Sequence, residues 1–169
     1  MSEQNSKEIR SKITSEGVLE LSIFNGEMPT PGENDVLIKV EGSPINPSDL
    51  GLLISFAADL DTLATSGEGD EAVTTMKIHP GLMGAMKPRL DDSMQVGNEG
   101  GGVVVDAGEN AKHLIGKTVG VAGGAMYSQY RCVPASSCLV MDDGTTAAEA
   151  ASSFVNPLTA LAFVETMKM

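Results

Sequence analysis

The sequence has 169 residues, a length that fits one domain with a fragment of a second, and its 41% apolar and 20% charged residues are a balance typical of a globular protein. A formal net charge of −12 excludes general electrostatic binding to nucleic acid, whose phosphates carry the same sign. Two cysteines provide neither a disulfide framework nor a structural zinc site, and no apolar run suits a signal peptide or a membrane span. A cytoplasmic protein with no membrane partner is therefore expected.

Short strands are predicted in the first part of the chain. Residues 18–24 are predicted to form a strand that a polar turn follows, and apolar and polar side chains alternate over residues 36–41. Ser48 and Asp49 then predict the N-cap and first turn of a short helix over residues 50–54.

The stretch over residues 55–94 lacks a clear period, so a lid or binding loop is expected there. Within it, Gly67-Glu68-Gly69-Asp70-Glu71-Ala72 matches the G-x-G-x-x-A form of the dinucleotide fingerprint. That fingerprint requires a preceding buried strand, and residues 59–66 have no strand pattern. Its three acidic side chains would also repel a pyrophosphate, so a flexible acidic loop is predicted instead of a phosphate site.

Strand signals return in the second half of the chain and give way to helix near the end. Their spacing, punctuated by glycine, is typical of a small β-barrel or sandwich. Four runs carry the signal: residues 101–106, 118–122, 127–133 and 138–141. Residues 146–155 are rich in alanine, and Pro157 occupies a plausible first position of a helix over residues 158–168.

Four motifs are informative because they occur together and in order. They are Pro44-Ile45-Asn46-Pro47-Ser48-Asp49, Gly97-Asn98-Glu99-Gly100-Gly101-Gly102-Val103, residues 116–130, and Asn156-Pro157-Leu158-Thr159-Ala160. Over nearly the whole chain they resemble the medium-chain dehydrogenase/reductase superfamily, and most of all its quinone reductase and 2-enoyl thioester reductase branches.

The resemblance implies a fold and a division into domains. The fold would be mainly β within the α+β class: a GroES-like, partly open β-barrel with short helices. Residues 1–150 would form this catalytic domain, and residues 151–169 the helical start of a nucleotide-binding domain whose Rossmann half is missing. By itself the chain is then expected neither to bind the cofactor tightly nor to catalyse.

The resemblance also implies that the protein does not use zinc. In the zinc alcohol dehydrogenases of this superfamily, a Cys occupies the place of Asn46 and a His the place of Asn98. Neutral Asn side chains are poor substitutes for thiolate and imidazole at a zinc centre. We therefore expect hydride transfer to an acceptor that is already polarised, either a quinone or an α,β-unsaturated carbonyl.

Three residues are predicted to serve the site on the strength of the resemblance. Asn46 would face the substrate and the nicotinamide, as the catalytic residue. Asn46, Asn156 and Thr159 would contact the cofactor, NADPH or NADH in the complete enzyme, with Thr159 near the carboxamide. Glu99 is expected to hold its loop in shape instead of taking part in the chemistry.

Two further features concern the acceptor. Enoyl reductases carry a Tyr proton donor beyond the first motif, whereas residues 50–98 contain no Tyr here, which favours a quinone-like acceptor or another donor. Methionines in residues 76–94 shape the acceptor pocket or belong to a flexible surface loop; the sequence leaves both interpretations open.

Two functions are compatible with these observations. The first is the catalytic-domain fragment of a zinc-free NAD(P)H-dependent oxidoreductase, active once a nucleotide-binding domain or subunit is supplied. The second is a free-standing GroES-like module that binds a partner protein and has no enzymatic activity. The apolar side chains of residues 158–167 favour a homo-oligomer or pairing with the missing subunit.

Overall fold

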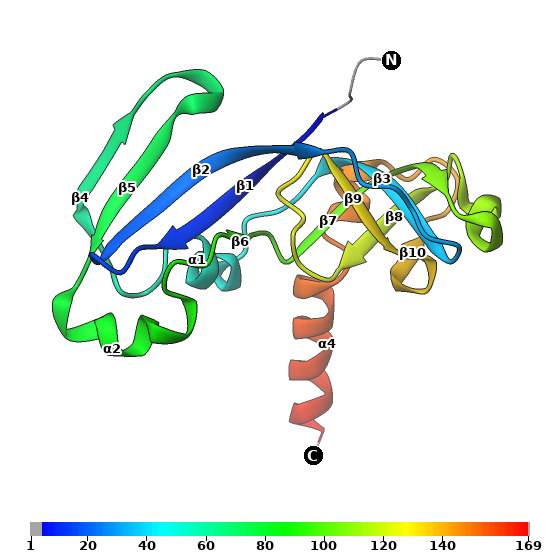
Figure 1. The fold of residues 1–169 in the computed structure, drawn as a ribbon. Helices are drawn as coiled ribbons and strands as arrows, with labels where there is room; N and C mark the ends of the chain where they lie inside the picture. The colour runs from blue at the N-terminus through cyan, green and yellow to red at the C-terminus, as the bar shows by residue number, and fades with distance from the viewer. Residues whose placement is uncertain (1–4, 169) are drawn as a thin grey trace.

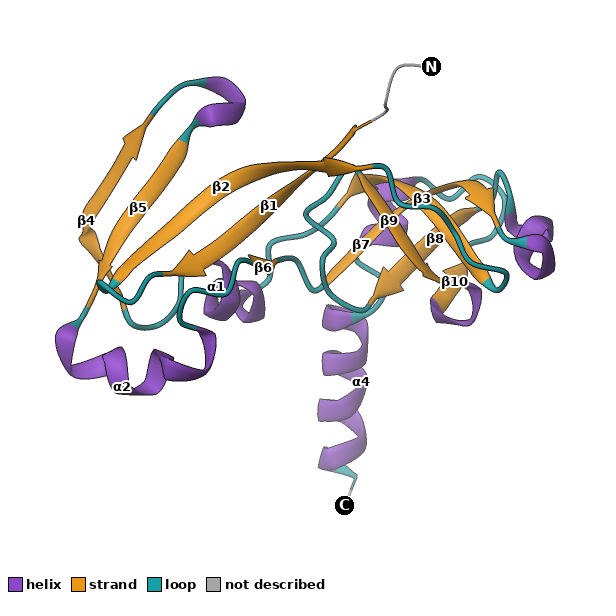
Figure 2. Cartoon of the chain, viewed as in Figure 1, coloured by secondary structure: helices purple, strands orange, loops and turns teal. Residues whose placement is uncertain are grey.

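The computed structural model describes residues 5–168, which form two antiparallel sheets joined by short helices (Figures 1 and 2). Each sheet has five strands. The first is ordered β4 (Ala58–Ser66), β5 (Val73–Ile78), β2 (Val18–Glu27), β1 (Asn5–Ile13) and β6 (Met94–Gln95). The second is ordered β10 (Cys138–Val140), β8 (Thr118–Ala122), β7 (Glu99–Ala107), β3 (Asp35–Gly42) and β9 (Tyr130–Pro134). The predicted fold class, mainly β with a partly open barrel and short helices, is confirmed.

The sheet that contains β3 surrounds the larger core. Val36 and Ile38 of β3 are fully buried, as the alternation over residues 36–41 predicts. They pack against Val104 of β7 and against Val119 and Val121 of β8. The strands predicted over residues 101–106, 118–122 and 138–141 are confirmed, and β9 begins at Tyr130, three residues later than predicted.

The prediction of a lid or binding loop over residues 55–94 is wrong. The segment contains β4, β5 and the short helix α2 (Met83–Met86). Two of its methionines are core residues: Met76 and Met86 are buried with Ile13 and Leu19. The sequence pattern hid the strands because β4 is largely exposed on both faces, so it has no alternation between apolar and polar positions.

The acidic motif also lies in a different setting from the predicted one. A strand, β4, does precede it, contrary to the expectation for residues 59–66. The residues Gly69–Glu71 form a single 3-10 turn at the tip of the β4–β5 hairpin, and a strand follows instead of a helix. This motif therefore lacks the helix N-terminus that a dinucleotide fingerprint presents to phosphate.

Two helices begin earlier than predicted. Helix α1 (Pro47–Leu53) has Asn46 as its N-cap, and Asp49 is the third helical residue, whose carboxylate accepts a hydrogen bond from the Asn46 amide nitrogen. Helix α4 (Val155–Met167) contains Pro157 at its third position, where the absent N–H costs no intrahelical hydrogen bond. No described helix is long and apolar enough to cross a membrane.

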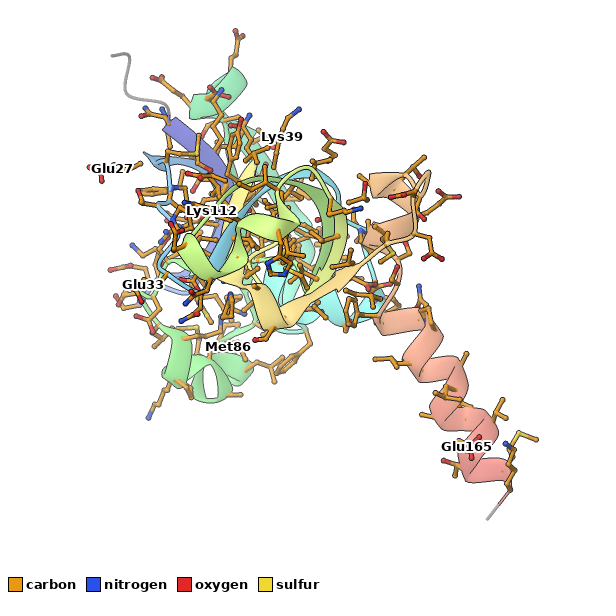
Figure 3. The ribbon with its side chains drawn as sticks, turned by 90° about the vertical axis from the view of Figure 1, so that its right-hand side faces the viewer. Glu27, Glu33, Lys39, Met86, Lys112 and Glu165 are labelled. Atoms are coloured by element: carbon orange, nitrogen blue, oxygen red, sulfur yellow. The ribbon has the colours of Figure 1, made fainter. Side chains whose placement is uncertain are left out.

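The end of the chain leaves the body of the protein. Helix α3 (Ala147–Ala151) packs on β7 and β8, so the domain boundary predicted at residue 150 falls inside a helix of the barrel side. Helix α4 then projects away from both sheets (Figures 1 and 3), and none of its described residues is buried. The division into two domains stays a prediction.

Close packing of β7 against β3 generates a prediction about stability. A Cβ atom on Gly102 would lie 2.0 Å from the Lys39 carbonyl oxygen, so Gly102→Ala forces the two strands apart. We expect the free energy of unfolding in urea to fall by about 2–3 kcal/mol. The control is Gly51→Ala in helix α1, where the new methyl group has no atom within 4 Å. Because alanine favours a helix more than glycine does, the free energy of unfolding should stay equal or rise slightly. Equal losses in the two variants would contradict this account.

Candidate functional site

Three of the four sequence motifs meet at one point in the structure. Asn46 Nδ2 donates to Glu99 Oε1 at 2.8 Å, and Asn156 Nδ2 donates to Asn46 Oδ1 at 3.2 Å. The second oxygen of Glu99 accepts hydrogen bonds from the backbone nitrogens of Phe154 and Val155, at 3.0 and 2.9 Å. We call Asn46, Glu99 and Asn156 the central network. Both oxygens of the Glu99 carboxylate are thus engaged, one at the N-terminus of α4.

A second carboxylate ties the first motif to the second from the other side. Asp49 Oδ2 accepts from the Asn46 nitrogen and Oδ1 accepts from the Asn98 nitrogen, both at 2.8 Å. The Asn98 side chain donates to Ser48 Oγ at 3.0 Å. Two loops distant in the sequence are therefore held together by one carboxylate.

Burial makes these contacts obligatory. The exposed fractions of Asn46, Asp49 and Glu99 are 4%, 2% and 1%. A buried carboxylate without partners is costly, and backbone N–H groups at a helix start are donors that the helix itself leaves unused. The structure therefore gives Glu99 the role predicted for it, which is to hold neighbouring segments in place.

The predicted cofactor residues lie near this point but are not all joined. Asn46 and Asn156 contact each other, whereas the Thr159 hydroxyl donates to the Val155 carbonyl oxygen at 2.6 Å within α4. Asn156 and Thr159 are three residues apart on the helix and thus share a face, and both are exposed. Their roles toward a cofactor stay predictions.

An apolar cavity of about 490 Å³ adjoins the first motif. Ile45, next to Asn46 in the chain, lines it, as does Tyr127, whose hydroxyl donates to the Pro44 carbonyl oxygen at 3.0 Å. Sequence reasoning placed Tyr127 in a barrel strand, but it precedes β9. A side chain on Gly97, which has a φ of +94°, would collide with the Tyr127 ring, so this glycine is the local signal that a bulky group lies there.

Tyr127 is also electrostatically unusual. Burial raises the pKa of its phenol to about 12, and the nearby Asp49 carboxylate adds to the rise because it disfavours a second negative charge. The cavity therefore presents a tyrosine that stays neutral well above physiological pH.

The residues present do not fit a zinc ion. The position that the resemblance gives to a ligand Cys is occupied by Asn46, whose amide oxygen and nitrogen are both engaged with Asn156 and Glu99. The amide of Asn98 likewise bonds to Ser48. Neutral amides already committed to one another are weak zinc ligands. Across residues 5–168 no group of three or more His, Cys, Asp and Glu side chains is arranged to hold a metal ion.

Comparison with known proteins supports the same class. No protein-family model matches the sequence, and no curated protein matches it. Among solved structures, a candidate NADPH:quinone reductase of Mesorhizobium loti is 25% identical over 97% of this chain, with a TM-score of 0.61. A candidate NADPH:quinone reductase of Bacillus thuringiensis is 24% identical over 98%, with a TM-score of 0.66. A mycobacterial protein solved with NADPH is 20% identical over 94%, with a TM-score of 0.61.

These matches show the class of fold. The chain has the GroES-like fold of the medium-chain dehydrogenases and reductases, and the predicted resemblance to that superfamily is confirmed. Two of the similar structures are described as NADPH:quinone reductases. The chain spans 44%, 42% and 39% of the lengths of the three proteins compared.

The engagement of Glu99 predicts the result of removing its charge. Glu99→Gln keeps the shape of the side chain but replaces one acceptor oxygen with an NH₂ group. This group would face the N–H donors of Asn46 or of Phe154 and Val155, and could accept no hydrogen bond from them. We expect the free energy of unfolding to fall by about 2–3 kcal/mol. Amide hydrogen exchange at Phe154 and Val155 should also accelerate. Glu165→Gln, whose carboxylate pairs with the exposed Lys168, is the control and should change neither quantity appreciably.

The raised pKa of Tyr127 predicts a pH dependence. The folded chain holds the phenol proton more tightly than the unfolded chain, whose tyrosines ionise near pH 10, so this contribution to stability is complete below pH 10. It is lost as the pH rises from 10 to about 12. Ultraviolet titration should show a tyrosinate step near pH 12 that Tyr127→Phe removes and Tyr130→Phe retains. A step near 12 that survives in Tyr127→Phe would refute the assignment.

Proposed function

We propose that this chain is the acceptor-binding part of a zinc-free oxidoreductase that transfers hydride from NADPH or NADH to a quinone or an α,β-unsaturated carbonyl. The observation that supports it most is the central network, in which three motifs of the resemblance converge beside an apolar cavity. In this proposal residues 1–150 form the GroES-like domain. Residues 151–169 lead into a nucleotide-binding domain or subunit, supplied by further polypeptide.

The central network suggests how Asn46 acts. When bound, the nicotinamide supplies the hydride. The side chain of Asn46 is held between Glu99 and Asn156, so its amide cannot rotate freely. Its Nδ2 carries two hydrogens, and one of them is donated in the hydrogen bond to Glu99. In this proposal the second hydrogen is donated to an acceptor oxygen on which negative charge develops, and fixed donors of this kind stabilise such charge best.

Asn156 and Thr159 are the proposed contacts to the cofactor. They occupy one face of the first turns of α4, and Asn156 touches the proposed catalytic residue directly. A nicotinamide laid along this face would be adjacent to Asn46. The chain's own contribution is then to orient the nicotinamide and the acceptor relative to each other.

The exposed apolar surface of α4 is also compatible with the second candidate function, a binding module without enzymatic activity. Leu158, Leu161, Phe163 and Val164 are between 50% and 68% exposed, and exposed apolar surface of this kind marks an interaction site. A nucleotide-binding partner, a second copy in a homo-oligomer or another protein could cover it. A GroES-like binding module would use this surface without any chemistry.

The two functions differ in what a nucleotide-binding domain restores. We expect the purified chain to show no micromolar NADPH binding by fluorescence titration. Fused at residue 169 to the nucleotide-binding domain of the M. loti protein, it should oxidise NADPH with a small quinone as acceptor. Asn46→Ala in the fusion should lower kcat/KM about 10- to 100-fold, whereas Asn110→Ala, an exposed position, should have little effect. Micromolar binding by the chain alone, or a fusion that binds NADPH but reduces nothing, would contradict the proposal.

A further inference from the structure

One face of the β1–β2 hairpin is apolar, and this apolar face extends past the residues that are buried in the core. Ile13 pairs with Leu19 and Ile9 pairs with Ile23 across the two strands, and period-2 geometry places all four side chains on the same face. Ile13 and Leu19 are fully buried in the smaller core. Ile9 and Ile23 are each 38% exposed. The apolar face is therefore buried at Ile13 and Leu19 and continues to the partly exposed Ile9 and Ile23.

This open part of the face is the floor of a groove. The cavity of about 490 Å³ beside Tyr127 and a second of about 270 Å³ share three lining residues, Ile9, Ile23 and Leu53. Leu53, the last residue of α1, forms a wall, and its carbonyl oxygen is fixed by the hydroxyl of Ser11 at 3.0 Å. The groove therefore continues across β1 and β2 as far as β5, a width of two strand spacings, or about 10 Å.

Charged groups at the rim are already paired with each other. Lys7 binds Asp70 at the tip of the β4–β5 hairpin, and Glu8 binds Arg10. Two hydroxyls at the inner end also donate to backbone oxygens, Ser43 to Met126 and Ser128 to Ala125. The interior of the groove thus offers hydrocarbon surface to a ligand and few unused donors.

We propose that this groove binds an apolar tail, a linear or prenyl hydrocarbon chain, carried by the acceptor. The head of the acceptor lies at the Ile45 and Tyr127 end, next to Asn46, and the tail extends over Ile9 and Ile23 toward β5. That the head is the reducible group rests on the proposed function; the binding of the tail does not. The tail removes from water an isoleucine pair that the fold leaves half-exposed.

The groove can be tested on the chain alone, without cofactor. Binding of 4-n-alkylphenols from methyl to nonyl is measured by calorimetry. Affinity should rise by about two- to fourfold for each methylene and then level off when the chain fills the groove. Ile23→Asp should abolish the dependence on length, whereas Leu139→Asp, at 46% exposure outside the groove, should preserve it.

A second variant guards against misfolding of the first. Thr74→Phe fills the β5 end of the groove with a residue that strands accept well. Short alkylphenols should then bind as before, and long ones should lose their added affinity. Affinity independent of chain length in the unmodified protein, or equal effects of Ile23→Asp and Leu139→Asp, would overturn the inference.

The fusion enzyme separates failure of the groove from failure of the proposed function. With 2-alkyl-1,4-benzoquinones, kcat/KM should increase with chain length and lose that increase in Thr74→Phe. A fusion that reduces no quinone, while the chain still binds alkylphenols according to length, overturns the function and leaves the groove intact. Reduction of quinones with no preference for length overturns the groove and leaves the function intact.

Discussion

The arrangement of the site depends on one buried carboxylate. Glu99 sits at the first position of β7, deep in the barrel, and its two oxygens accept from Asn46, Phe154 and Val155. A carboxylate withdrawn from water requires such partners, and here they come from two segments that are 53 and 55 or more residues away. Satisfying one buried charge therefore fixes both the amide of Asn46 and the point at which α4 leaves the barrel.

Buried and charged side chains also hold both ends of helix α1, which begins after Asn46. A helix of seven residues is too short to be stable by itself. Asp49 joins its start to the loop of Asn98, while the Arg89 guanidinium donates to the carbonyl oxygens of Gly51 and Leu52 at its end. A cation at a helix C-terminus is favourable. The segment from residue 89 to residue 98 thus clamps the helix at both ends, and Asn46 is held as its N-cap.

Two of the apolar surfaces that the described residues leave exposed matter for the proposal. One is the helix α4, which projects from the body (Figures 1 and 2). The other is the groove over Ile9 and Ile23. Both adjoin the central network: α4 through Asn156, and the groove through Ile45. The proposed division of labour follows from this placement, with a cofactor-bearing partner on one side of Asn46 and an acceptor on the other.

The sequence by itself determined the strands whose inner faces are apolar, such as β3 and β8, because alternation depends only on neighbouring residues. It also determined the four ordered motifs and hence the class of fold. It missed β1 and β4, because most residues of β1 are polar and β4 is largely exposed, so neither strand shows the alternation of apolar and polar positions. Only the tertiary structure joined Asn46 to Glu99 and placed Tyr127 beside the first motif. Those contacts depend on how the sheets close, and no local period encodes the closure of a sheet.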